Sequence, residues 1–148
     1  MRPAADIGAP PPAALASARR RVLALVYEAL LLTAVLLVGA LPFVMLAQGA
    51  DRELARPLLQ AWLVALAGVY FIWQWRRGGQ TLALKTWRMR IVTRDGAPLT
   101  GAHALKRFVI ALPATLLLGA GFLWALVDRE GLFLHDRLAG TKIVREDL

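Results

Sequence analysis

Residues 19–32 read RRRVLALVYEALLL, three arginines followed by an apolar run that contains a single acid, Glu28. The run continues to Ala47, so that Val22–Ala47 is interrupted only by Glu28, Thr33 and Pro42. A helix of about 20 apolar residues crosses the hydrocarbon core of a bilayer. This segment therefore predicts a membrane-spanning helix with a carboxyl group inside it.

The composition of the whole chain agrees with a membrane protein. Of its 148 residues, 58% are hydrophobic and only 19% are charged, which is more apolar material than one small core can bury. Two further apolar runs are Leu58–Trp75 and Phe108–Val127, and Pro113 and the Gly119 to Gly121 step interrupt the second of these. The sequence predicts an all-α membrane protein with two transmembrane helices and, at 108–127, a third membrane helix or a re-entrant hairpin.

The chain divides into a short arm and one domain. Residues 1–18 are rich in Pro and Ala without apolar periodicity, which predicts a disordered arm, and residues 19–146 form the membrane domain. The first apolar run is too long and begins too late for a removable signal peptide.

Basic residues predict the orientation of the spans, because cytoplasmic flanks carry an excess of Lys and Arg. Three arginines precede the first run and eight basic residues follow the second, whereas the two arginines between the runs are balanced by Asp51 and Glu53. We expect a multi-pass protein of a bacterial cytoplasmic (inner) membrane with a cytoplasmic N-terminus, and Trp73 and Trp75 at its interface. The net charge of +8 favours anionic headgroups as partners, and no motif indicates nucleic acid.

The polar segments between and after the runs have order of their own. Leu84, Trp87 and Ile91 recur at helical spacing, which predicts an amphipathic turn, and Met89–Thr93 and Thr141–Arg145 have the composition of strands. If these two strands pair, they lie on the same side of the membrane and the third run is re-entrant. A full crossing would place the tail outside, although its basic residues favour the cytoplasm.

No pattern of catalytic or metal-binding residues is present. The chain lacks cysteine, and its two histidines, His103 and His135, show no metal-ligand spacing, so we expect hydrogen-bonded or solvent-facing imidazoles. There is no P-loop, dinucleotide fingerprint or Ser-His-Asp pattern. The sequence therefore predicts a protein that is not an enzyme and has no metal and no cofactor.

Several motifs together resemble the RDD family of small integral membrane proteins. They are an arginine and an acid seven residues apart (Arg21, Glu28), GGQTL (Gly78 to Leu82) and LHDRLAGT (Leu134 to Thr141). The family is named for one arginine and two aspartates, and the resemblance assigns these to Arg21, Glu28 and Asp136, with glutamate in place of the first aspartate. The chain also departs from the family at Ala83 and Leu84, where relatives often have Gly-Lys. Secondary candidates for a supporting role are Gly79, Gln80, Thr81, Arg107 and His135.

The two acids each allow two interpretations. Arg21 and Glu28 are about 10 Å apart along one helix face, so Glu28 needs a partner from another segment, a water-filled path or a proton. It is either a cation or proton site or a structural acid that fixes helix packing. Asp136 either braces the LAGT turn through backbone amides or joins a polar cluster with Glu28 and Arg107.

Three functions of different class remain open for the whole chain. One is a membrane enzyme in which Glu28 or Asp136 acts as a general base, for which the sequence offers no positioned reacting group. The resemblance implies transport of ions or small solutes, for which two or three helices would have to assemble into a homo-oligomer. The alternative is a non-catalytic accessory or scaffold protein that holds a membrane partner, with close helix approach at the glycines of the apolar runs, Gly39, Gly68, Gly119 and Gly121.

Overall fold

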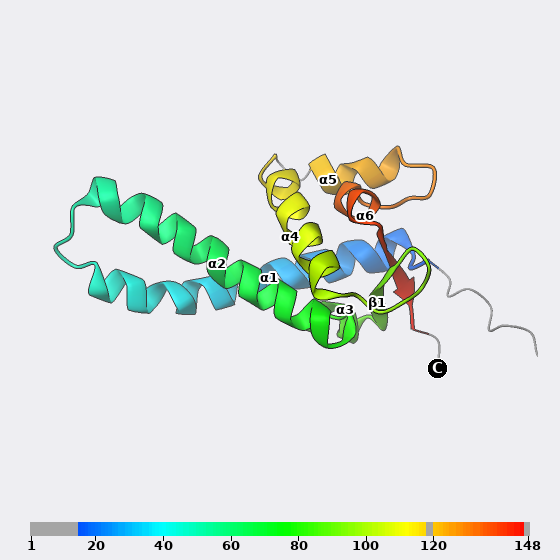
Figure 1. Cartoon of the computed structure of the whole chain (residues 1–148), viewed down its shortest axis with the longest axis horizontal. Helices are drawn as coiled ribbons and strands as arrows, with labels where there is room; N and C mark the ends of the chain where they lie inside the picture. Colours follow the sequence, from blue (N-terminus) through cyan, green and yellow to red (C-terminus); the bar gives the residue numbers. More distant parts are fainter. Residues whose placement is uncertain (1–14, 118–119, 147–148) are drawn as a thin grey trace, which may run out of the picture.

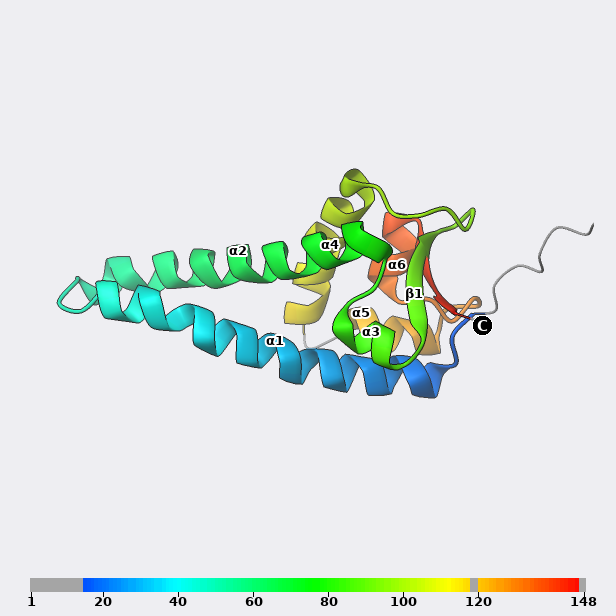
Figure 2. The same cartoon turned by 90° about the horizontal axis from the view of Figure 1, so that it is seen from below.

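The computed structural model describes residues 15–117 and 120–146. Two long helices, α1 (Ala18–Leu46) and α2 (Arg52–Gly78), form a hairpin that projects from a smaller body, which we call the knob (Figure 1). The knob comprises residues 79–117 and 120–146, and the first turns of α1 lie against it (Figure 2).

The hairpin confirms the two helices that the apolar runs predict. Both are long and apolar enough to cross a membrane, and each extends beyond its run into polar sequence. The side chain of Asp51 accepts a hydrogen bond from the backbone N–H of Glu53 (3.0 Å) and so caps the start of α2. Near the tip, the Trp62 indole donates to the carbonyl of Gly39 (2.8 Å), which joins the two helices.

The glycine pair at the end of α2 turns the chain into the knob. Gly79 has a left-handed conformation (φ 66°), and a Cβ on it would lie 2.3 Å from the carbonyl oxygen of Ile91. The Ile91 N–H donates to the Gly79 carbonyl (2.7 Å) at this close approach. Only glycine fits both the conformation and the contact.

Two short strands then pair within the knob. Helix α3 (Leu82–Thr86) leads into β1 (Met89–Thr93), which pairs antiparallel with β2 (Thr141–Arg145) in the register Met89↔Arg145. The middle loop and the tail therefore lie at the same end of the hairpin. The two strand-like segments predicted from the sequence do pair, as this arrangement requires.

The last residues of the predicted N-terminal arm pair with β2. Residues 1–14 of the expected disordered arm lie outside the described residues, but Leu15 forms an isolated bridge with Val144, and Ala16 donates to the carbonyl of Ile143 (3.2 Å). The outer edge of β2 offers unpaired backbone groups, and residues just before α1 pair with them.

The third apolar run does not form one continuous helix. Its first part lies in α4 (Gly101–Leu116), and the rest forms α5 (Ala120–Leu123) and a 3-10 turn (Trp124–Leu126) before α6 (Leu134–Ala139). Figure 1 shows α4 crossing the hairpin at a steep angle and α5 turning back over the knob. A Cβ on Gly121 would lie 2.7 Å from Ala114, so α5 packs closely on α4. The run is therefore divided between α4 and α5, and its path relative to the membrane stays a prediction.

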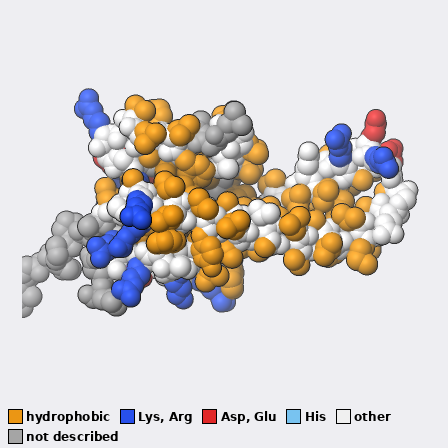
Figure 3. Space-filling view, turned by 180° about the vertical axis from the view of Figure 1, so that it is seen from behind, with side chains coloured by type: hydrophobic (Ala, Val, Ile, Leu, Met, Phe, Trp, Pro, Cys, Tyr) orange, Lys and Arg blue, Asp and Glu red, His pale blue; other side chains and the backbone are white. Residues whose placement is uncertain are grey.

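The core lies in the knob, while the hairpin leaves its apolar side chains uncovered. Met89, Ile91 and Val144 are almost fully buried, but Leu37, Val38 and Met45 in α1 are each about two-thirds exposed. Figure 3 shows hydrophobic side chains along the hairpin and basic ones at the knob end and the tip. This surface suits lipid as its surrounding solvent.

The two interfacial tryptophans differ in their surroundings. Trp73 is 56% exposed, as expected at an interface, but Trp75 is only 5% exposed and stacks on Phe71. The placement of Trp75 at the membrane interface is therefore wrong, because it faces the knob core.

Candidate functional site

A buried ion pair joins α4 to α6. The guanidinium of Arg107 contacts the carboxylate of Asp136, and their side chains are only 4% and 1% exposed. Thr141 at the start of β2 completes the group, because its hydroxyl accepts from Arg107 (2.8 Å) and lies 3.2 Å from the Asp136 carboxylate. We call these three residues the buried triad.

Local folding explains why the LAGT turn brings two members of the triad together. Helix α6 ends at Gly140 in the left-handed conformation (φ 70°), and the chain reverses into β2. Asp136 thus faces Thr141 across the turn. Asp136 does brace this turn, but it contacts the side chain of Thr141 and not backbone amides. It also pairs with Arg107, but Glu28 is not part of this cluster. Each of the two interpretations of Asp136 is therefore met only in part.

Aromatic rings and the imidazole of His135 lie beside the triad. The Arg107 guanidinium lies 4.9 Å from the centre of the Trp75 ring, and burial lowers the pKa of Arg107 to about 9, so it remains protonated at neutral pH. His135 packs against the rings of Phe122 and Phe133. Burial, and then the charge of Arg107, hold the pKa of His135 well below its usual value, so its imidazole is neutral.

The expectation of a solvent-facing or hydrogen-bonded imidazole is wrong for His135, which is 4% exposed. Its Nδ1 has no hydrogen-bond partner among the described residues. His103 meets the expectation, since its Nδ1 lies 2.8 Å from the hydroxyl of Thr100.

Arg21 fixes the start of α1 to the loop before α6. Its guanidinium donates to the carbonyl of Gly131 and lies 5.2 Å from the centre of the Phe133 ring. Asp128 shapes this loop, because its carboxylate accepts from the N–H of Leu132 (2.9 Å) and pairs with Arg137. The Leu132 N–H and, to a smaller extent, Arg137 lower the pKa of Asp128. Sequence reasoning missed Asp128, for which the turn sequence DREG is the available signal.

Glu28 forms a separate cluster where α1, α2 and α3 meet. Its carboxylate accepts hydrogen bonds from the Tyr70 hydroxyl (2.7 Å) and from the Thr81 hydroxyl. Figure 2 shows α1 and α2 diverging toward the knob, with α3 close to α1. We call Glu28, Tyr70 and Thr81 the Glu28 cluster. Sequence reasoning missed Tyr70, whose hydroxyl within an apolar run is the signal that could have found it.

Thus the three motif residues do not form one cluster. Arg21, Glu28 and Asp136 each connect a different set of segments around the knob. Gln80 adds a further connection, because its amide donates to the carbonyl of Met89 (3.0 Å) and to Glu146 (2.9 Å). Within residues 15–117 and 120–146, no group of three His, Cys, Asp or Glu side chains is arranged to hold a metal ion.

Comparison with protein families identifies a match that covers most of the chain. The family model described as the RDD family matches residues 15–140, which include all three motif residues and agree with the resemblance in the sequence. No curated protein and no solved structure matches the chain.

Proposed function

Because the chain belongs to the RDD family of membrane proteins, we propose that it transports or exchanges a cation as an oligomer, with Glu28 as the residue that binds the cation or a proton. The observation that supports this most directly is the Glu28 cluster. Between Glu53 and Asp95 there is no acid, and Glu28 is the one acid of α1. An acid in this setting is a candidate for an ion or proton pathway.

The chemistry of the Glu28 cluster suits a small hard cation or a proton. Its carboxylate and two hydroxyls bring oxygen atoms from three segments to one place, and oxygen is the ligand that hard cations prefer. Hydroxyl groups both donate and accept, so they can reorient when the carboxylate gains a proton or a cation. A single carboxylate provides one negative charge, which favours a monovalent ion.

Transport would require more than one copy of the chain. The two long helices pack closely at Gly39, where a Cβ would lie 2.5 Å from Leu66, and two helices alone do not enclose a path. A path would therefore form between hairpins, using the exposed faces of α1 and α2. Homo-oligomerisation is part of the proposal for this reason.

The proposed topology places the hairpin across a bacterial inner membrane and the knob in the cytoplasm. It is supported by the start of α1, the paired strands and most of the basic residues, which lie at the knob end. The bent third run then returns to the cytoplasmic side. The proposal involves no catalytic step and no cofactor.

The test measures cation flux into vesicles that contain the purified protein. We expect Glu28→Gln to abolish Na⁺- or proton-driven flux, and Tyr70→Phe to reduce it, because the first removes the charge and the second one hydroxyl. The matched control is Glu53→Gln, which neutralises an exposed acid at the hairpin tip and should leave the flux unchanged. Normal flux in a folded Glu28→Gln protein would overturn the proposal.

A scaffold role is the second candidate, because the charged motif groups all have partners inside the chain. This is what purely structural side chains require. The glycines give this role less support, since Gly39, Gly68 and Gly121 face Leu66, Phe108 and Ala114 of the same chain. The fourth, Gly119, lies outside the described residues. Recovery of a stoichiometric membrane partner after mild solubilisation, with vesicles that show no flux, would favour the scaffold.

A further inference from the structure

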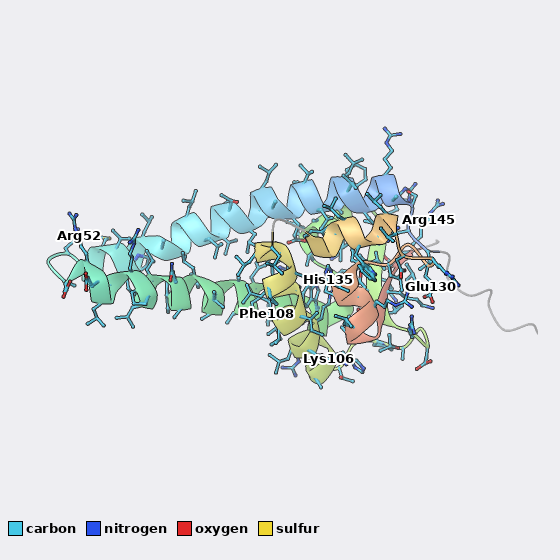
Figure 4. All side chains as sticks on the ribbon, turned by 90° about the horizontal axis from the view of Figure 1, so that it is seen from above. Arg52, Lys106, Phe108, Glu130, His135 and Arg145 are labelled. Atoms are coloured by element: carbon cyan, nitrogen blue, oxygen red, sulfur yellow. The ribbon has the colours of Figure 1, made fainter. Side chains whose placement is uncertain are left out.

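One face of α2 forms an open groove beside the point where α4 crosses it. Its volume is about 520 Å³, and it is lined by Gly68, Val69, Ile72, Trp73, Arg76 and Arg77. Phe108 of α4, labelled in Figure 4, lies close to the apolar end of this groove, because a Cβ on Gly68 would lie 3.2 Å from its ring. Val69 and Trp73 are 69% and 56% exposed, so the groove is accessible from the surface.

The residues along this groove change from apolar to basic in one direction. Gly68, Val69 and Ile72 lie toward the middle of α2, and two arginines lie at its knob end. The distance from Gly68 to Arg77 along the helix is about 14 Å, from the rise of 1.5 Å per residue. One leaflet of hydrocarbon is about 15 Å deep. The groove therefore matches the depth and polarity of a single leaflet.

The two arginines are held in place but lack a carboxylate. Arg77 lies 4.6 Å from the centre of the Trp73 ring, and Arg76 lies beside the start of α4, where a Cβ on Gly101 would be 3.4 Å from its Nε. In the described part of the chain, the four ion pairs use other arginines (Arg90, Arg94, Arg107 and Arg137). A phosphate group would supply the missing negative charge.

We propose that this groove binds one anionic glycerophospholipid from the leaflet on the knob side. The phosphate contacts Arg76 and Arg77, and an acyl chain lies along Gly68, Val69 and Ile72. Trp73, with its amphipathic ring, lies at the level of the glycerol. The site is independent of transport, because Glu28 does not line it.

A second groove at the hairpin tip supplies a comparison within the same chain. It is lined by Arg52 and Arg56 among apolar residues, but also by Glu53. The acid balances part of the positive charge, so we expect no preference for an anionic lipid there. Arg52 marks this end of the molecule in Figure 4.

The experiment titrates the purified full-length chain in detergent with phosphatidylglycerol or phosphatidylcholine and counts bound lipids by native mass spectrometry. We expect one retained phosphatidylglycerol and a weaker retention of phosphatidylcholine. Arg76→Gln with Arg77→Gln should weaken phosphatidylglycerol binding by about tenfold or more, from the attraction of two basic residues. The control, Arg52→Gln with Arg56→Gln, should bind as the unchanged chain does.

A second variant tests the acyl part of the site. Val69→Trp fills the exposed groove and keeps both arginines, so it should also lose the retained lipid. The proposal would be overturned if the Arg52 and Arg56 control lost as much bound phosphatidylglycerol as the Arg76 and Arg77 variant, or if the Arg76 and Arg77 variant lost none. Full displacement of the lipid by glycerol phosphate, with Val69→Trp binding normally, would also overturn it, because the site would then recognise phosphate alone.

Discussion

Replacing Asp136 by asparagine tests the structural role of the buried triad. The change keeps the size of the side chain but leaves the Arg107 guanidinium, which is 4% exposed, without a negative partner. Breaking a buried ion pair by removing one member costs about 3–5 kcal/mol. Because a folded domain is stable by only about 5–15 kcal/mol, we expect Asp136→Asn to remove a large part of the free energy of unfolding.

The assay for Asp136→Asn is reversible unfolding of the purified protein in mixed micelles, followed by tryptophan fluorescence. Its matched control is Glu130→Gln, which breaks an exposed ion pair with Arg94. The side chains of Arg94 and Glu130 are 50% and 54% exposed. That loss should be below about 1 kcal/mol. The double change Arg107→Met with Asp136→Leu should be less destabilising than Asp136→Asn, since no unpaired charge remains. Equal stability of Asp136→Asn and Glu130→Gln would refute the reasoning.

Three further changes give distinct outcomes. Gly79→Ala should lower the free energy of unfolding by about 2 kcal/mol or more in the same assay, because residue 79 has a left-handed conformation and a Cβ there would clash with Ile91. The control is the neighbouring Gly78→Ala, which has open space around it and should cost nothing. His135 is neutral when folded because its pKa is lowered, so the unfolded chain gains a proton below about pH 6.5 and stability falls there by about 1.4 kcal/mol per pH unit. His135→Gln should remove the contribution of His135 to this fall of stability with decreasing pH. An unchanged pH dependence would contradict a neutral His135 in the folded state. Arg21→Gln should lower stability by about 1–3 kcal/mol through loss of a charged hydrogen bond. A loss no larger than that of the nearby exposed Arg19→Gln would exclude an anchoring role.

Hydropathy predicts the hairpin because lipid-facing helices need continuous apolar sequence. The runs 22–47 and 58–75 lie almost entirely within α1 and α2, and the helices extend past them only where polar ends meet water or the knob. Strand composition likewise locates both β1 and β2. These features depend on residues close together in the chain, so local patterns suffice to find them.

Local patterns say nothing about partners that are distant in sequence. Tyr70 and Thr81 reach Glu28 across 42 and 53 residues, and only the fold decides that three elements meet there. Burial shows the same limit, because Trp75 next to two arginines suggests an interface. In the fold this residue is 5% exposed, and its ring stacks on Phe71 and lies 4.9 Å from the guanidinium of Arg107 in α4. The break after α4 was ambiguous for a related reason: a run of apolar residues fits a span or a bent path equally well.

The surroundings of Asp136 and Glu28 favour different roles for the two acids. Asp136 is enclosed with a fixed positive charge, and changing its state would leave a buried arginine unpaired, so it is unsuited to binding and releasing an ion repeatedly. Among the described residues, the hydrogen-bond partners of Glu28 are two hydroxyl groups, which adapt to either state of the carboxyl group at little cost. Substitutions should therefore separate the two functions. Asp136→Asn should lower the free energy of unfolding by several kcal/mol, whereas Glu28→Gln should keep the stability and lose flux. If both changes mainly destabilise the chain, both acids are structural.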